Sequence, residues 1–133
     1  MTKRELINTA KEAMKFAYVP YSGFSVGAAL LGKSGTVYTG CNIENASFGG
    51  TNCAERTALF KAISEGEREF DAIAVVSSAG DTTYPCGICR QVLSEHMTDG
   101  ALYFEDKEGN IVESTMKEML PYMFDNEIPN KKQ

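Results

Sequence analysis

Two features that would tie this chain to a membrane or to nucleic acid are missing from its sequence. No apolar run approaches the roughly 20 residues that a membrane-spanning helix needs. There is no cluster of basic residues either, and 13 Lys and Arg residues stand against 18 Asp and Glu residues, a formal net charge of −5. Binding to phosphate backbones requires clustered cations. We therefore expect a small neutral substrate, and neither a membrane nor a nucleic acid as partner.

A targeting segment, internal repeats, low-complexity tracts and linkers are also missing. The first residues, Met1 to Leu6, contain no apolar stretch of the secretory type, so we expect a cytoplasmic protein whose thiols stay reduced. The length of 133 residues suits one domain, which buries about two-thirds of its unfolded surface and needs no disulfides. We expect a single domain over residues 1–125 and a polar tail over residues 126–133.

Apolar periodicity and capping signals predict four helices and five strands along the chain. The expected helices span 2–20, 52–66, 86–99 and 115–120, and the expected strands span 24–31, 36–41, 71–77, 101–104 and 110–113. Strands separated by helices require crossover connections. The order of elements predicts an α/β fold, a three-layer α/β/α sandwich with a mixed sheet of about five strands.

Cysteine is scarce, and three of the four cysteines lie in two short motifs. These are Cys53-Ala54-Glu55 and Pro85-Cys86-Gly87-Ile88-Cys89. Three thiolates leave one corner of a tetrahedral zinc ion open for water, which is typical of a catalytic site rather than a structural one. The motifs therefore predict one zinc ion bound by three cysteines, with a glutamate that is not a ligand.

Two other roles are open to these cysteines, a closed structural zinc site and a redox pair. A closed structural site would need a fourth ligand, and only Cys41 and the single histidine, His96, are left. We expect Cys41 to be a small buried residue and His96 to be a core histidine on the inward stripe of its helix, whose other inward residues include Ile88. A redox role for the C-x-x-C pair would not explain the presence of Cys53 and Glu55.

Both motifs fall where helices are expected to begin. Asn52 is the expected N-cap of one helix with Cys53 directly after it, and Cys86 is the expected cap of the next with Cys89 one turn in. The positive dipole end and the free N–H groups of a helix start favour a thiolate over a thiol. Two such starts at one edge of the sheet predict a shared metal site.

Two arginines are candidates for the surroundings of the metal. Zinc with three thiolates and a hydroxide carries a net negative charge, which reduces the acidity of water at the metal. A hydrogen-bonding cation would offset this charge. Arg56 follows Glu55 and is the first candidate, Arg90 follows Cys89 and is the second, and a solvated surface position is the alternative for either.

Glu55 is expected on the buried face of its helix, because it lies three and four residues before Ala58 and Leu59. A buried carboxylate is costly unless it has a partner or a task. Beside a metal-activated water that task is proton transfer. The alternative is a capping role, since Asn52 and Glu55 have the spacing of a capping box.

Several longer stretches, together with these motifs, carry a resemblance to a known family. They are Pro20-Tyr21-Ser22, Phe24 to Leu30, Gly40 to Ala46, Asn52 to Ala58, Pro85 to Gln91 and Leu120-Pro121. Over nearly its whole length the chain resembles the short, homotetrameric cytidine deaminases. C-x-E with P-C-x-x-C alone is shared by the wider superfamily of zinc deaminases.

The resemblance implies hydrolytic deamination of cytidine and 2′-deoxycytidine to uridine and 2′-deoxyuridine, a reaction of pyrimidine salvage, with one Zn²⁺ per subunit. It implies that water activated by zinc attacks C4 of the base while Glu55 moves a proton to N3 and then to the departing ammonia. It also implies that the Ala54 N–H binds the pyrimidine O2, that Asn42 and Glu44 bind the ribose 3′-hydroxyl, and that Phe24 packs against the nucleoside. Ordinary loop polarity is the alternative for Asn42 and Glu44.

The resemblance further implies a homotetramer in which Ala46, Phe48 and Phe124 contact the site of a neighbouring subunit. An apolar cluster between Met119 and Phe124 points the same way, since closed symmetry would bury it, while folding back on the sheet is the alternative. The family often has Tyr at the position of Phe48. Phe keeps the ring and lacks the hydroxyl, which puts a hydrogen bond to the sugar from this position in question.

Two other functions compete with this one. A related deaminase would act on another aminopyrimidine, such as an antibiotic nucleoside, but Phe24, Asn42 and Glu44 favour plain nucleosides. A zinc-stabilised interaction module would need no catalysis, but a glutamate on the buried face of a helix argues against it.

Overall fold

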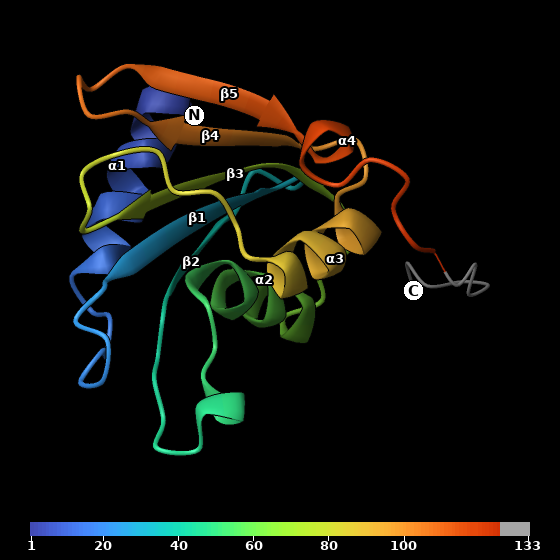
Figure 1. Cartoon of the computed structure of the whole chain (residues 1–133). Helices are drawn as coiled ribbons and strands as arrows, with labels where there is room; N and C mark the ends of the chain where they lie inside the picture. Colours follow the sequence, from blue (N-terminus) through green and yellow to red (C-terminus); the bar gives the residue numbers. More distant parts are fainter. Residues whose placement is uncertain (126–133) are drawn as a thin grey trace.

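Five strands form one mixed sheet in the order β2-β1-β3-β4-β5 within residues 1–125, the part of the chain that the computed structural model describes (Figure 1). The polar tail expected at residues 126–133 lies outside the described residues. Neighbouring strands are antiparallel except for β3 and β4, which run parallel. The elements in chain order are α1 (Lys3–Met14), β1 (Val26–Gly32), β2 (Val37–Cys41), the 3-10 helix η1 (Phe48–Gly50), α2 (Ala54–Ser64), β3 (Phe70–Ser77), α3 (Gly87–His96), β4 (Ala101–Glu105), β5 (Ile111–Thr115) and α4 (Met116–Met119).

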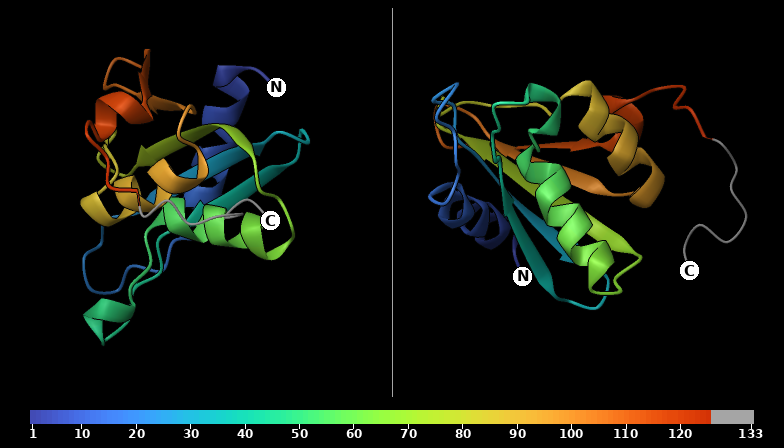
Figure 2. Two further views of the ribbon diagram at one scale, coloured as in Figure 1. Left: turned by 90° about the vertical axis from the view of Figure 1, so that its right-hand side faces the viewer. Right: turned by 90° about the horizontal axis from the view of Figure 1, so that it is seen from below.

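Helices cover both faces of the sheet, so the fold has three layers. Seen from below in the right panel of Figure 2, α1 lies on one face while α2 and α3 lie on the other. On the first face Leu6, Ile7 and Ala10 of α1 are buried against the sheet. On the second face Ala58 and Leu59 of α2 belong to the larger core. The predicted α/β/α sandwich with a mixed sheet of five strands is confirmed.

The parallel pairing of β3 and β4 places α2 and α3 on the same face of the sheet. Parallel neighbours cannot be joined by a tight hairpin, so the chain crosses over between β3 and β4 through α3. This crossover puts α3 on the same face as α2, which precedes β3. Within the described residues no helix is both long and apolar enough to cross a membrane.

The first helix is shorter than predicted. Its N-terminus is a capping box, in which the Thr2 hydroxyl accepts from the Glu5 N–H and the Glu5 carboxylate accepts from the Thr2 N–H. It ends at Met14 instead of continuing to Pro20. The Tyr18 N–H donates to Asn42 O and the Tyr18 carbonyl accepts from the Glu44 N–H, a short pairing that takes this segment out of the helix. Pro20 also disfavours helical backbone just before it.

The predicted cap of α2 is wrong by one residue. Cys53 is the N-cap, with extended backbone, because Asn52 is held in a bridge with Ile43. Cys86 is the N-cap of α3, as expected. The prediction that Ile88 points inward is wrong, since 61% of it is exposed. It faces solvent because the buried stripe of α3 passes through Cys89 and Leu93.

Two glycines let the helices approach the sheet closely. A Cβ at Gly27 of β1 would lie 2.1 Å from Ala10 O in α1. A Cβ at Gly40 of β2 would lie 2.4 Å from Ala54 O and 2.5 Å from Ala58 N in α2. Any side chain at Gly40 would therefore displace the first turn of α2, the turn that begins with Cys53.

Candidate metal centre and substrate site

The structure brings Cys53, Cys86 and Cys89 together. Their sulfur atoms all lie within 4.8 Å of one another, and the sulfurs of Cys53 and Cys86 are 3.7 Å apart. Cys53 and Cys86 are the N-caps of α2 and α3, and Cys89 is the third residue of α3. Neither cap side chain accepts a capping hydrogen bond from the backbone of its own helix, so both thiols are available as ligands.

The three thiols fit a zinc ion. A tetrahedral ion with Zn–S bonds of about 2.3 Å places its sulfurs about 3.8 Å apart, close to the separation of Cys53 and Cys86. The donors are all sulfur, which suits zinc rather than magnesium or calcium. Two converging helix N-termini add positive dipole ends that stabilise thiolate charge.

The surroundings of Cys53 favour the thiolate form of its side chain. Hydrogen bonds from Cys89, from Arg56 and from Cys86 lower the pKa of Cys53 to about 5, although burial opposes this shift. The hydrogen bond to Cys53, together with burial, raises the pKa of Cys89.

Arg56 lies where it can compensate this charge. Its Nη2 lies 3.3 Å from the Cys53 sulfur. Burial lowers the pKa of Arg56, but hydrogen bonds to Cys53 and Cys89 outweigh burial and raise it, so the guanidinium stays charged. Its Nε is buried and has no hydrogen-bond partner among the described residues.

Arg90 occupies a different position. Its Nε donates to Pro85 O at 2.8 Å and its Nη1 donates to Met119 O at 2.9 Å. These bonds connect the segment before α3 to the end of α4. Arg90 therefore contacts the carbonyl next to Cys86, whereas Arg56 contacts the sulfur of a ligand directly.

Glu55 is buried in the first turn of α2, with 4% of its surface exposed. Burial raises the pKa of its carboxyl to about 7, and the negative charge of Cys53 adds to this shift. The charge of Glu55 in turn helps to raise the pKa of Cys89. A carboxyl with such a pKa can both hold and release a proton near neutral pH, as general acid–base chemistry requires.

The remaining cysteine and the histidine lie away from the metal cluster. Cys41 is partly buried at the end of β2, where burial raises the pKa of its thiol. His96 is partly buried at the end of α3. It lines a separate polar cavity of about 280 Å³ together with Lys33 and Asp71.

Two of the expected nucleoside-binding residues, Phe24 and Asn42, are linked by one hydrogen bond. The Asn42 side chain donates to Phe24 O at 2.7 Å and accepts from Val26 N at 2.9 Å. Phe24 is 39% exposed, so its ring is open to a ligand. Ala54 is the first residue of α2, and its N–H therefore lies outside the hydrogen-bond ladder of the helix.

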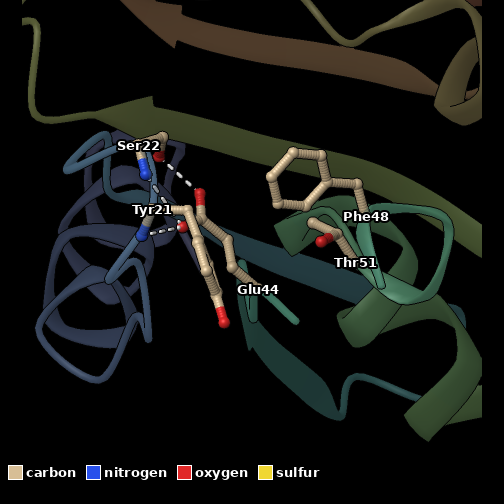
Figure 3. A pocket seen from close by; sticks show the side chains of 5 residues that line it. All are labelled: Tyr21, Ser22, Glu44, Phe48 and Thr51. Carbon is tan, nitrogen blue, oxygen red and sulfur yellow. Dashed lines mark hydrogen bonds between the residues drawn. The ribbon is translucent and has the colours of Figure 1, made fainter. Parts of the chain in front are cut away.

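Glu44 lines a cavity of about 360 Å³ at the loop between β2 and α2 (Figure 3). The other lining residues are Tyr21, Ser22, Phe48 and Thr51. The rings of Tyr21 and Phe48 meet edge to face with their centroids 5.6 Å apart. The sequence did not single out Ser22 or Thr51, although Ser22 stands in the stretch Pro20-Tyr21-Ser22 that carries part of the resemblance.

The three residues expected to contact a neighbouring subunit are all exposed. Phe48 is 72% exposed and Phe124 is 68% exposed, and Ala46 lies on the same exposed loop as Phe48. The Phe124 carbonyl accepts from Gln91 Nε2 at 3.1 Å, which ties this segment to α3. Two large aromatic side chains are thus left without cover on the single chain.

Known proteins are similar to this chain in sequence and in fold. Residues 1–105 match the family described as cytidine and deoxycytidylate deaminase zinc-binding region. The chain is 53% identical over 131 residues to a cytidine deaminase from Halalkalibacterium halodurans, covering 98% of this chain and 99% of the relative. It is 49% identical over 128 residues to a cytidine deaminase from Sporosarcina psychrophila, covering 96% and 94%.

The solved structures agree with these relatives. The crystal structure of cytidine deaminase from Burkholderia pseudomallei matches with a TM-score of 0.88 and 46% identity, covering 93% of this chain and all of the other. The family match includes the C-x-E and P-C-x-x-C motifs, whose three sulfurs converge in the structure. The chain therefore belongs to the zinc-binding cytidine and deoxycytidylate deaminase family.

Proposed function

We propose that this protein hydrolyses cytidine and 2′-deoxycytidine to uridine and 2′-deoxyuridine and releases ammonia. The observation that carries the proposal is the buried carboxyl of Glu55, whose pKa is raised to about 7, beside a cluster of three thiols that leaves a zinc ion one open corner. Relatives at about half identity over nearly the whole chain are cytidine deaminases.

Cys53, Cys86 and Cys89 would hold the zinc ion. When bound, zinc supplies a Lewis acid that lowers the pKa of a water molecule and so provides a nucleophile at neutral pH. Arg56 keeps the thiolates from donating too much charge, because its guanidinium shares the charge of Cys53. Arg90 supports the same site more remotely, by fixing the carbonyl of Pro85.

Glu55 carries the protons of the reaction. Its carboxylate accepts a proton from the attacking water and passes it to N3 of the cytosine ring. It then takes the remaining proton from the hydroxyl now attached to C4 and transfers it to the amino group, so that the C4–N bond breaks, ammonia leaves and the carbonyl of uridine forms. One water is consumed and one ammonia is released, so Glu55 returns to its starting state after each turnover.

The nucleoside is held by groups around this centre. The Ala54 N–H donates to the pyrimidine O2, and the ring of Phe24 packs on the nucleoside. Asn42 and Glu44 bind the 3′-hydroxyl, and each keeps hydrogen-bonding capacity beyond the bonds that it already makes.

We further propose a cytoplasmic homotetramer that serves pyrimidine salvage, with residues 1–125 as the single catalytic domain and one zinc per subunit. The exposed rings of Phe48 and Phe124 support the assembly, because contacts between subunits would cover them. Ala46, Phe48 and Phe124 would then complete the site of a neighbouring subunit. Mixing Cys86→Ala protein with Phe124→Ala protein should restore part of the activity through hybrid sites once subunits exchange.

A direct assay tests the proposed activity. The zinc-loaded protein is incubated with cytidine, and the loss of ultraviolet absorbance of cytidine is followed together with ammonia. We expect equal amounts of uridine and ammonia, loss of activity after zinc is removed with a chelator, and recovery when zinc is restored. Turnover of an antibiotic aminopyrimidine nucleoside without turnover of cytidine would change the proposed substrate. Zinc binding without any deamination would favour a purely structural module.

A further inference from the structure

The Glu44 carboxylate is held by three donors from one short segment of the chain. Its Oε1 accepts from the Tyr21 N–H at 2.9 Å and from the Ser22 N–H at 3.0 Å, and its Oε2 accepts from the Ser22 hydroxyl. Ser22 is 22 residues away from Glu44 in the sequence, and Figure 3 shows this segment meeting Glu44 at the edge of the cavity. Ser22 is thus the residue that contacts Glu44 with both its backbone and its side chain.

The Ser22 hydroxyl also connects Glu44 to another expected substrate contact. Its oxygen accepts from the Phe24 N–H at 3.0 Å while it donates to Glu44. The Phe24 carbonyl in turn accepts from the Asn42 side chain. A continuous chain of hydrogen bonds therefore runs from Asn42 through Phe24 and Ser22 to Glu44.

We propose that Ser22 is a positioning residue that orients Glu44 toward the sugar and leaves it one acceptor site for an incoming hydroxyl, an inference that rests on the proposed deamination of nucleosides. An ionised carboxylate offers about four lone-pair sites, and three of those on Glu44 are filled. The remaining site belongs to Oε2. A single acceptor in a fixed direction recognises one hydroxyl group at one position of the sugar.

The surroundings of Glu44 suit this role. The cavity beside it is lined by the aromatic rings of Tyr21 and Phe48 and by Thr51, so Glu44 is the one charged residue among the described residues that line it. The Ser22 hydroxyl and the two backbone N–H groups hold the pKa of Glu44 below its usual range. The carboxylate consequently stays ionised at neutral pH and acts only as an acceptor.

Substrates with and without the 3′-hydroxyl separate this role from a purely structural one. We expect Ser22→Ala to raise the KM for 2′-deoxycytidine by about tenfold with little change in kcat, because a hydrogen bond to a charged group is lost. The KM for 2′,3′-dideoxycytidine should change little, so the preference for the 3′-hydroxyl should fall by about the same tenfold factor. Ser22→Thr keeps a hydroxyl on an exposed residue and should retain the preference.

Ser78→Ala is the matched control, since the Ser78 hydroxyl accepts from the Ser25 N–H at 3.0 Å and is not among the donors to Glu44. It should leave the preference unchanged. Combining Ser22→Ala with Glu44→Gln should cost little more than Glu44→Gln alone, because both act on the same hydroxyl contact. Equal losses for substrates with and without the 3′-hydroxyl, or no loss at all, would overturn the inference.

Binding of the products provides a readout that needs no turnover. Affinities of 2′-deoxyuridine and 2′,3′-dideoxyuridine for the zinc-loaded protein are measured by calorimetry. The inference requires wild-type protein to prefer 2′-deoxyuridine and Ser22→Ala to lose most of that preference. An unchanged preference in Ser22→Ala, with cytidine still deaminated, would sink the role of Ser22 alone. Absence of deamination by wild-type protein would sink the proposed function instead.

Discussion

The pKa of a carboxyl group is lowered on one face of the sheet and raised on the other. Under α1, Glu105 at the end of β4 contacts Arg4 and Lys11, and the hydrogen bond from Lys11 is the first cause that lowers its pKa. On the other face, Glu55 of α2 is buried, and burial raises the pKa of its carboxyl to about 7. A shift of that size costs roughly 3 kcal/mol when the buried group is ionised.

Both layers pack against the sheet, but only the layer of α2 and α3 holds an acid with a raised pKa beside a cluster of thiols. The α1 layer surrounds its acid with cations from the covering helix and packs apolar side chains against the sheet. In the layer of α2 and α3, two helices begin near one point and three thiols come together. Among the described residues, Arg56 is the cation whose charge acts on the buried acid of this layer. The acid without full compensation is the one that can exchange a proton near neutral pH.

Among the substitutions considered, removal of one cysteine thiol should have the largest effect on zinc binding and activity. We expect Cys89→Ala to lose zinc and all detectable activity, because two thiolates hold the ion too weakly. Cys41→Ala is the control, since Cys41 lies at the end of β2 outside the cluster. It should keep one zinc per subunit and normal turnover, as measured by metal analysis and the absorbance assay. Full zinc occupancy in Cys89→Ala would remove that residue from the ligand set.

The same substitution on each face compares the two acids directly. Glu55→Gln should keep its zinc but lower kcat by about 10²–10⁴-fold, because an amide can form hydrogen bonds but cannot carry the proton. Glu105→Gln should leave kcat unchanged. Steady-state kinetics on metal-loaded protein make the comparison. Turnover near the wild-type level in zinc-loaded Glu55→Gln would contradict the assignment of Glu55.

Of the two arginines near the thiol motifs, Arg56 should affect mainly activity and Arg90 should affect mainly stability. Arg56→Ala should lower activity by about 10–100-fold and shift the lower limb of the pH–rate profile upward, because water at the metal becomes less acidic when the thiolates donate more charge. Its effect on the melting temperature of the zinc-loaded form should be smaller. Arg90→Ala should reduce the melting temperature, through loss of the bonds to Pro85 and Met119, without moving the profile. An unmoved profile in Arg56→Ala would assign it to packing only.

Substitutions at Gly27 and Gly40 test whether the close packing of α2 on the sheet is needed for metal binding. Gly27→Ala and Gly40→Ala should each cost about 1–3 kcal/mol of stability, since a methyl group would press on helix backbone in both cases. Only Gly40→Ala should also weaken zinc affinity, because it displaces the turn of Cys53 and Glu55. Competition with a colorimetric chelator under folding conditions measures this. Equal zinc affinity in the two variants would show that α2 can shift without moving its ligand.

The smallest effect concerns stability against pH on the α1 face. The pKa of Glu105 is lowered in the folded protein, so its contribution is present at neutral pH and is lost as the pH falls through the folded pKa. Glu105→Gln should therefore cost about 1 kcal/mol at pH 7, and the gap to wild type should close in acid. Chemical denaturation at several pH values tests this. If the difference in unfolding free energy between wild type and Glu105→Gln grew as the pH fell, the pKa of Glu105 would not be lowered by folding.

Local spacing was enough to predict much of the site. Cys53, Cys86 and Cys89 follow from two short motifs, and the burial of Glu55 follows from its position three and four residues before Ala58 and Leu59. The layered fold follows from the order of elements. These features depend on helical periodicity and on the chemistry of residues that are close in the sequence.

Tertiary structure alone decided the features that join distant residues. The end of α1 at Met14 depends on the pairing of Tyr18 with Ile43, and the cap at Cys53 depends on the bridge of Ile43 with Asn52. The contact of Ser22 with Glu44 likewise became visible only in the fold. Each of these spans a gap along the chain that no local pattern encodes, because backbone groups bond to whatever partner the packing of the layers brings within reach.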